Sequence, residues 1–274
     1  VTGSCFLIET EKTKVLVDCG LFQGEERWKK KNFTPLPFSA ENIDALILTH
    51  AHIDHSGRIG QLYKEGFRGR VFSTEPTKDL ARLILFDSFN ILKREARELG
   101  KRMPFSENDI KNCIKLFHLV DYKKKVRISE DISFCLQDAG HILGSAIVEL
   151  FLREERKTKK IVFSGDLGNP PAPFLYPPER IKEADFVICE STYGNRIHQS
   201  REERRDLLED TVEETIKKKG ALLIPAFVLE RTQEILFELN NLIENNFSFN
   251  FTRLPKMMNP NYELSFQTYI SSFN

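Results

Sequence analysis

One short run of the chain carries most of its metal-binding side chains: His50-Ala51-His52-Ile53-Asp54-His55. Three imidazoles and one carboxylate within six residues are a poor choice for core packing, because each buried polar group needs a partner. The run follows an apolar segment at 45–49, which places it on a tight loop leaving a strand, where its side chains can converge. Neutral imidazole and carboxylate oxygen suit zinc best, with manganese or iron as alternatives. The run therefore predicts a metal site.

Two later loops carry matching side chains. Residues 138–145 present His141 after a strand, and residues 163–168 present Asp166 between two glycines. A carboxylate has two oxygens, so Asp166 is suited to bridge two cations. Together with the first run, these loops hold four of the six histidines of the chain. We expect the three loops to meet at one site.

The elements that must position these loops alternate short β-rich runs with longer helical ones. We expect strands at 5–9, 14–17, 45–49, 126–128, 132–136, 146–151, 161–164 and 186–189. Helices are expected at 56–66 and 77–100; the second has Leu80, Leu83, Ile84, Ile91 and Leu92 at helical spacing. This mixture predicts an α+β fold with two sheets sandwiched between helices.

The pattern changes at about residue 193. A charged amphipathic helix is expected at 201–219, a short strand at 221–224 and another helix at 230–244, which together suggest the opening of an α/β unit. Residues 246–274 hold five Phe and five Asn but no Gly, Ala, Val or Asp. We interpret this tail as frameshifted or disordered. The predicted domains are thus 1–194, 195–245 and the atypical tail 246–274.

The composition sets further bounds. Lys plus Arg and Asp plus Glu are 40 each, so net charge gives no global attraction to nucleic acid. The five cysteines are odd in number and widely spaced, which argues against a disulfide framework and against a cysteine zinc site. No apolar stretch approaches the ~18 residues of a membrane span, and no signal peptide opens the chain. The sequence therefore predicts a cytoplasmic protein without membrane partners.

The set His-x-His-x-Asp-His, a loop His and Ser-Gly-Asp resembles the metallo-β-lactamase superfamily over residues 1 to about 192. The resemblance implies an αββα sandwich, and we expect the N-terminal strand of that fold to be missing from this chain. It implies that one zinc ion is held by His50, His52 and His141. A second would be held by Asp54 and His55, and Asp166 would bridge the two. Asp18 matches an early Asp that supports the metal loop without binding metal.

Finer motifs resemble the β-CASP branch of that superfamily, which includes bacterial ribonucleases and the endonuclease of eukaryotic mRNA 3′-end processing. They are residues 2–5 (Thr-Gly-Ser-Cys), 18–24 (Asp-Cys-Gly-Leu-Phe-Gln-Gly) and 190–194 (Glu-Ser-Thr-Tyr-Gly). The resemblance implies hydrolysis of RNA phosphodiester bonds by a metal-activated water that Asp54 and Asp166 orient. Glu190 would position the His that protonates the leaving group. Arg231 and Gln233 match residues that face the backbone of single-stranded RNA. Exonuclease or endonuclease action, RNA preference and oligomeric state, a dimer included, stay open.

The chain also departs from this branch. After Glu190 the only histidine is His198, which lies too early to match the two later histidines of the family. The second metal site is therefore expected to lack a ligand, and the chain is expected to be truncated and a poor ribonuclease. Two alternatives stay open: an inactive metal-binding fragment, and a hydrolase of small thioesters or lactams. The Glu190 motif and the α/β segment after it argue against the second.

Overall fold

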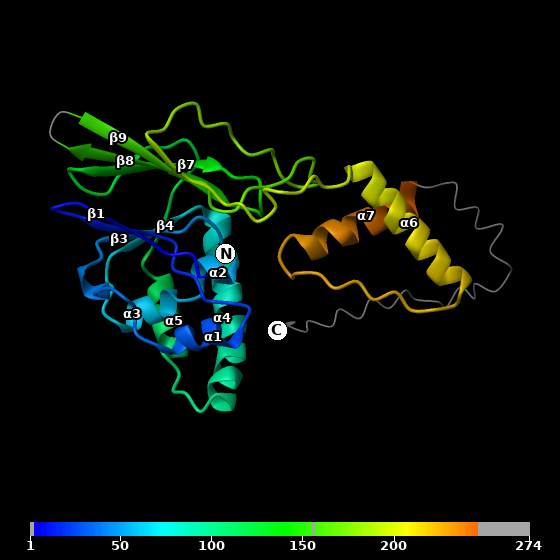
Figure 1. The fold of residues 1–274 in the computed structure, drawn as a ribbon, viewed down its shortest axis with the longest axis horizontal. Helices are drawn as coiled ribbons and strands as arrows, with labels where there is room; N and C mark the ends of the chain where they lie inside the picture. The colour runs from blue at the N-terminus through cyan, green and yellow to red at the C-terminus, as the bar shows by residue number, and fades with distance from the viewer. Residues whose placement is uncertain (1–2, 155–156, 246–274) are drawn as a thin grey trace. The chain divides into compact units, whose positions relative to one another are not determined.

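A computed structural model describes residues 3–154 and 157–245, and the predicted tail at 246–274 lies outside this range. The chain divides into two compact units, Val1–Gly194 and Asn195–Asn274 (Figure 1). The first unit contains all three predicted metal loops. None of the described helices is long and apolar enough to cross a membrane.

The first sheet of this unit, sheet A, has the strand order β1-β2-β3-β4-β5. Its strands are β1 (Phe6–Glu9), β2 (Lys14–Val17), β3 (Ala45–Ile47), β4 (Arg70–Ser73) and β5 (Phe117–Leu119). β1 and β2 are antiparallel, whereas β2 to β5 run parallel. The central strand β3 is buried along its whole length, as expected of a parallel strand covered on both faces. The carboxyl ends of β2 and β3 therefore lie at the same edge of the sheet.

The second sheet, sheet B, has the order β10-β9-β8-β7-β6. Its strands are β6 (Val126–Arg127), β7 (Ile132–Asp138), β8 (Ala146–Glu154), β9 (Lys157–Phe163) and β10 (Phe186–Ile188). All neighbours are antiparallel except β9 and β10. β7 and β8 pair from Ile132↔Leu152 to Asp138↔Ala146, so their connection at 139–145 forms a hairpin loop. This is the loop that carries His141.

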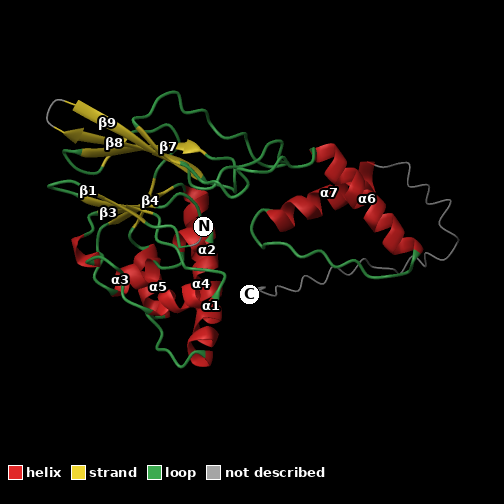
Figure 2. Ribbon diagram, in the orientation of Figure 1, coloured by secondary structure: helices red, strands yellow, loops and turns green. Residues whose placement is uncertain are grey.

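The two sheets pack face to face, and the main core lies between them (Figure 2). Alternating apolar residues of both sheets fill it, including Val15, Val17 and Ile47 from sheet A and Phe134, Val148, Leu150 and Phe163 from sheet B. Helices α3 (Ile59–Lys64), α4 (Glu75–Glu98) and α5 (Glu107–Ile114) lie on the other side of sheet A. On the outer face of sheet B, Ala139, Ile147 and Val162 pack with Leu167 and Ile181. The predicted α+β sandwich is confirmed, and the described residues of this unit form its first three layers.

Helix α4 is confirmed, but its buried face differs from the predicted one. Thr74 caps its N-terminus, where the threonine side chain accepts a hydrogen bond from Thr77 N. The buried residues are Thr77, Ala81, Leu85, Leu92 and Ala96, whereas Leu83 is 65% exposed. Large apolar residues lie on several faces of α4. Their spacing alone therefore did not identify the face that packs against the core.

One expected helix near the metal loops was wrong in detail, and three short helices were not expected. The predicted helix at 56–66 is two short helices, α2 (Ile53–Ser56) and α3 (Ile59–Lys64), separated by Gly57 and Arg58. The break arises because Arg58 N donates to Cys19 O (2.8 Å), which bends the chain toward the end of β2. Between β2 and β3 lie the short helices α1 (Glu26–Lys29), η1 (Lys30–Phe33) and η2 (Ala40–Asn42), which the sequence reading did not anticipate.

The second unit contains α6 (Arg201–Lys217) and α7 (Arg231–Asn245), close to the predicted helices. Ser200 and Glu203 form a capping box at the start of α6. Arg201 Nη2 pairs with Glu238 Oε1 at 2.6 Å, which joins the two helices. The predicted strand at 221–224 is wrong: these residues form a loop. A lone apolar run has no ladder to join, because the described part of this unit contains no strand that could pair with it.

Candidate metal centre

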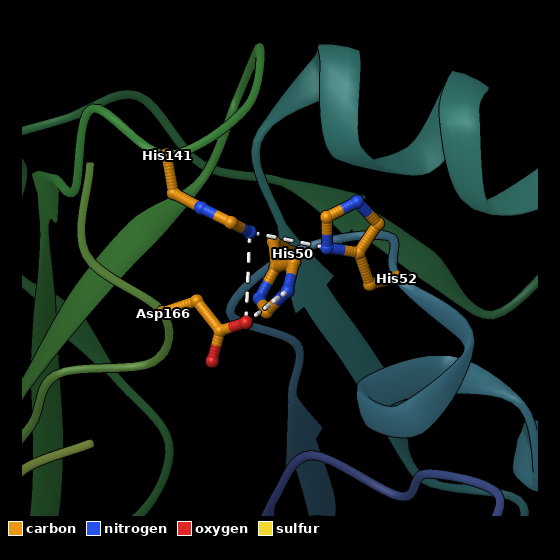
Figure 3. A group of neighbouring side chains, drawn as sticks. All are labelled: His50, His52, His141 and Asp166. Atoms are coloured by element: carbon orange, nitrogen blue, oxygen red, sulfur yellow. Dashed lines mark hydrogen bonds and ion pairs between the residues drawn. The ribbon is translucent and has the colours of Figure 1, made fainter. Parts of the chain in front are cut away.

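Four of the predicted ligands converge at one edge of the two sheets (Figure 3). His50, His52, His141 and Asp166 each offer a ligand atom, and these atoms all lie within 4.8 Å of one another. Nε2 of His141 is 3.1 Å from Nδ1 of His52 and 3.5 Å from Oδ2 of Asp166. His50 Nε2 is 3.7 Å from the same Asp166 oxygen. The three loops predicted to meet therefore do meet.

The ends of strands supply these side chains. His50 and His52 lie between β3 and α2, His141 lies in the hairpin loop between β7 and β8, and Asp166 follows β9. Backbone hydrogen bonds tie the loops together across the sandwich. Ala146 N donates to Thr49 O (2.8 Å), and Gly168 N donates to Ala139 O (2.9 Å). The site is thus held by both sheets.

His50 has an unpaired atom that a cation would satisfy. The side chain is fully buried, and its Nε2 has no hydrogen-bond partner among the described residues. Its Nδ1 is 3.0 Å from Thr49 Oγ1, which orients the ring. Burial, helped by the neighbouring imidazoles, lowers the pKa of His50 well below its usual value. Burial likewise lowers the pKa of His52, to about 4. Both rings are therefore neutral at pH 7, which is the form that binds metal.

The two oxygens of Asp166 face different groups of side chains. Oδ2 faces His50 and His141, as given above, whereas Oδ1 is 3.2 Å from His55 Nε2. The carboxylate is less than a third exposed. Burial alone would raise the pKa of Asp166, but the hydrogen bond and charge of His55 outweigh it and lower that pKa. Asp166 is therefore an anion placed between two sets of predicted ligands.

Asp18 contacts His55 at Nδ1, the ring nitrogen that does not face Asp166. Its Oδ2 is 2.7 Å from His55 Nδ1 and accepts from Thr49 Oγ1 (2.8 Å), while Oδ1 accepts from Thr49 N (2.8 Å). The Asp18 backbone adopts φ 60°, a left-handed conformation uncommon outside glycine, in which N–H still donates to Ile47 O (3.0 Å). The unusual backbone directs a buried carboxylate at the metal loop. His55 Nε2 is left facing Asp166.

Asp54 and His55 form the remaining side of the site. Asp54 Oδ2 lies 4.0 Å from His55 Nε2, and burial raises the pKa of this carboxyl group. Burial disfavours the charged His55 ring, but Asp18 and Asp166 together outweigh burial and raise the pKa of His55 to about 10. A cation that bound Nε2 would have to displace that proton.

Residues that the sequence reading missed fix the His141 loop. Thr74 Oγ1 and Thr77 Oγ1 both donate to Gly144 O, at 2.7 and 2.8 Å, so the first turn of α4 holds the end of the loop. Gly168 packs so closely on Gly140 that a Cβ there would lie 1.7 Å from Gly140 O. Thr49 is another missed residue, and its place directly before His50 was a usable signal.

Glu190 contacts the Asp166 loop and not the histidines. Its Oε1 accepts from Leu167 N (3.0 Å) and its Oε2 from Thr192 N (3.2 Å). Its own N–H donates to Ser164 Oγ (3.0 Å). Leu167 directly follows Asp166, so these bonds set the path of that loop. The structure therefore places Glu190 beside the predicted site as a side chain that holds a loop.

Arg231 and Gln233 lie in the second unit, in the first turn of α7, and both are exposed. Arg231 Nη1 donates to Glu234 Oε2 (2.6 Å). Their predicted contact with RNA stays a prediction. The described cysteines are all free; Cys19, Cys113 and Cys135 are buried and Cys189 is exposed.

Comparison with known proteins shows which protein family the chain resembles. A model of the metallo-β-lactamase superfamily domain matches residues 7–167. Ribonuclease TTHA0252 of Thermus thermophilus is 37% identical over 240 residues, which cover 87% of this chain and 52% of that protein. Transcription termination factor FttA of Methanocaldococcus jannaschii is 37% identical over 242 residues, covering 87% and 37%. An RNase J-like protein of the same organism is 34% identical over 245 residues, covering 88% and 52%. The chain thus spans about half or less of the length of these relatives.

The fold, the His/Asp cluster and the domain match agree, and the chain belongs to the metallo-β-lactamase superfamily. Its matched relatives place it in the β-CASP branch, as the motifs predicted.

Proposed function

We propose that the chain carries the catalytic metal centre of a ribonuclease that hydrolyses RNA phosphodiester bonds. His50, His52 and His141 would hold one divalent metal ion, and Asp54 and His55 a second, with Asp166 shared between them. The observation that carries this proposal is the orientation of Asp166, whose Oδ2 faces His50 and His141 while its Oδ1 faces His55. The unpartnered buried Nε2 of His50 supports the first site independently.

The donor set favours zinc, because imidazole nitrogens dominate the first site, with manganese as the alternative. Bound divalent metals in such a site lower the pKa of a water molecule and stabilise charge that develops on a phosphate. Asp54 and Asp166 would orient the attacking water by accepting its hydrogen bonds. Glu190 would keep Asp166 in place through Leu167 N. Asp18 would keep the Nε2 of His55 turned toward the metal.

RNA is the proposed substrate because the matched relatives include proteins named as a ribonuclease and as RNase J-like. The exposed Arg231 and Gln233 on α7 would contact the backbone of single-stranded RNA. The free cysteines suit a reducing compartment, and we propose a cytoplasmic enzyme.

The test is cleavage of end-labelled single-stranded RNA by the purified chain with added zinc or manganese. Asp54→Ala is compared with Asp87→Asn, which alters an exposed carboxylate of α4 as a matched control. We expect slow cleavage that requires metal and is abolished by a chelator. We expect Asp54→Ala to lower its rate on the order of 100-fold or more, with Asp87→Asn unchanged.

Two results would contradict the proposal. RNA cleavage that survives both the chelator and Asp54→Ala would come from another protein or another site. Metal-dependent hydrolysis of a lactam or thioester, without any RNA cleavage, would assign the centre to small molecules.

A further inference from the structure

Phe22 and Trp28 form an aromatic pair in the segment that follows β2. Their ring centroids are 6.4 Å apart and the planes differ by 19°, so the rings are stacked with an offset. Trp28 is the only tryptophan of the chain and is 37% exposed. An exposed tryptophan in a fixed stack is an unusual surface feature, because Trp is normally well buried.

Basic side chains surround this pair. Lys31 Nζ lies 4.4 Å from the centroid of the Trp28 ring and 5.5 Å from that of Phe22. The guanidinium carbon of Arg58 is 4.8 Å from the Phe22 centroid, and that of Arg27 is 5.3 Å from the Trp28 centroid. These distances are typical of cation–π contacts.

Acidic residues balance only part of this charge. Arg27 pairs with Glu25 at 2.9 Å, and Lys30 pairs with Glu26 at 2.7 Å. No carboxylate among the described residues pairs with the ammonium group of Lys31. The segment thus offers an aromatic surface with an uncompensated cation beside it.

This aromatic and basic surface is attached directly to the metal loop. Leu21 N donates to Ile53 O (2.9 Å), and Cys19 N donates to His55 O (2.8 Å). Gly20 packs so tightly that a Cβ there would lie 1.6 Å from Asp54 O. Phe22 is the next residue along the chain after Leu21, so it lies beside the backbone that carries Asp54 and His55.

The surface is also rigid. Asn32 is 2% exposed, and its side chain accepts from Phe22 N and donates to Phe22 O, both at 2.8 Å. Arg58 Nε donates to Gly20 O (2.6 Å), which fixes the cation over the Phe22 ring. Leu21 is anchored in the core with Leu85 and Phe105.

We propose that Phe22, Trp28 and Lys31 form a base-stacking subsite for single-stranded nucleic acid, next to the metal centre. This inference rests on the proposed ribonuclease function and deepens it. An unpaired base would stack on the Trp28 ring, while Lys31 would attract the phosphate that follows it. Stacking platforms of aromatic rings with adjacent cations bind single strands with little sequence preference, because every base presents a π face.

The single tryptophan makes the subsite directly observable. The full chain is titrated with a 12-nucleotide oligouridylate in the presence of a chelator, so that no cleavage occurs, and tryptophan emission is recorded. We expect saturable quenching by the oligouridylate and none by inorganic polyphosphate of matched charge. If fluorescence anisotropy of a labelled oligouridylate reports binding while Trp28 emission stays constant, the subsite is refuted and the proposed function stands. If the RNA is neither bound nor cleaved with metal, the proposed function fails and the subsite fails with it.

Variants separate stacking from packing. Trp28→Leu should weaken oligouridylate binding about 5- to 150-fold, the cost of one stacked base, whereas Trp28→Phe should stay within about 3-fold of the original chain. Phe186→Leu is the matched control, since Phe186 is an aromatic residue of β10 that is 59% exposed, and should bind normally. Lys31→Gln should reduce the salt dependence of binding by about one phosphate contact.

Circular dichroism and metal binding check that each variant is folded. Equal oligouridylate affinity of the original chain and a folded Trp28→Leu variant would overturn the proposal and assign the surface to a protein partner or to loop packing. If Trp28→Leu does not fold, Trp28→Phe and the quenching titration decide.

Discussion

Replacing Asp18 by asparagine tests how the chain directs His55 toward a metal. Asparagine tolerates the left-handed backbone found at this position (φ 60°), so the substitution changes the side-chain chemistry and not the backbone preference. The Asp18 carboxylate accepts three hydrogen bonds, from Thr49 N, Thr49 Oγ1 and His55 Nδ1. The asparagine side chain offers only one oxygen as an acceptor. Its NH₂ group takes the place of the other carboxylate oxygen and must face a group that donates to Asp18 in the original chain.

The consequence falls on His55. If the amide oxygen keeps the Thr49 N–H, the NH₂ group faces His55 Nδ1 and favours the tautomer in which Nδ1 accepts and Nε2 carries the proton. That Nε2 faces Asp166 and is the atom that the proposed second metal would bind. Loss of such an orienting partner lowers metal affinity by about 10- to 100-fold, or ~1.4–2.8 kcal/mol. The proposed first site uses His50, His52 and His141, and its metal affinity should change less than about 3-fold.

The assay is a chelator-competition titration with zinc that resolves two affinities. We expect Asp18→Asn to weaken the second affinity by the stated factor and leave the first nearly unchanged. Leaving a buried donor without an acceptor should also cost about 1–3 kcal/mol in the free energy of unfolding without metal. Equal weakening of both affinities, or of neither, would refute the reasoning that Asp18 acts through His55.

Three further predictions concern Asp166, Asp131 and Gly168. Asp166→Asn removes the charge between the two sites, so metal analysis after dialysis should find no second equivalent while circular dichroism stays unchanged; a retained second equivalent would show that Asp166 does not bridge. Asp131 is partly desolvated, but hydrogen bonds from Ser129, Thr10 and Thr13 outweigh this and lower its pKa to about 2. Because the unfolded pKa is about 3.9, the stability that Asp131 confers is complete above pH ~4 and is lost as pH falls through about 2. Chemical denaturation should therefore show the difference from Asp131→Asn shrinking over that window, and a constant difference would contradict the assignment. Gly168→Ala places a Cβ 1.7 Å from Gly140 O, so it should lower both metal affinity and melting temperature. Gly194→Ala, whose nearest contact would be 3.4 Å, is the control and should stay within about 0.5 kcal/mol.

Local patterns predicted the parts of the site that lie close together in the chain. His50, His52 and His55 follow one buried strand, so their spacing alone indicated a shared loop. Asp18 is different: it reaches His55 across 37 positions, and only the family resemblance pointed to it. Spacing also could not show that the two oxygens of Asp166 face different histidines, because that depends on how sheet A and sheet B stack.

The errors have the same physical origin. The strand expected at 221–224 was wrong because an apolar run becomes a strand only when a partner is present to complete its hydrogen bonds. The hydroxyl groups of Thr74 and Thr77 hold Gly144 O across about 70 residues, a contact that no periodicity encodes. On α4 the pattern indicated a helix but not its buried face. Tertiary packing determined both this long-range contact and the buried face of α4.

The central claim is a two-metal centre with Asp166 between the ions, and anomalous diffraction at the zinc edge tests it most directly. Crystals of the zinc-loaded chain should show one strong peak within about 2.0–2.1 Å of imidazole nitrogens of His50, His52 and His141. A second, weaker peak should lie about 3.5–4 Å away, beside Asp54, His55 and Asp166 Oδ1. The second peak should be weaker because, among the described residues, one imidazole faces its position and three face the position of the first peak. A single peak that remains single at saturating zinc, or two peaks that do not share Asp166, would contradict the account.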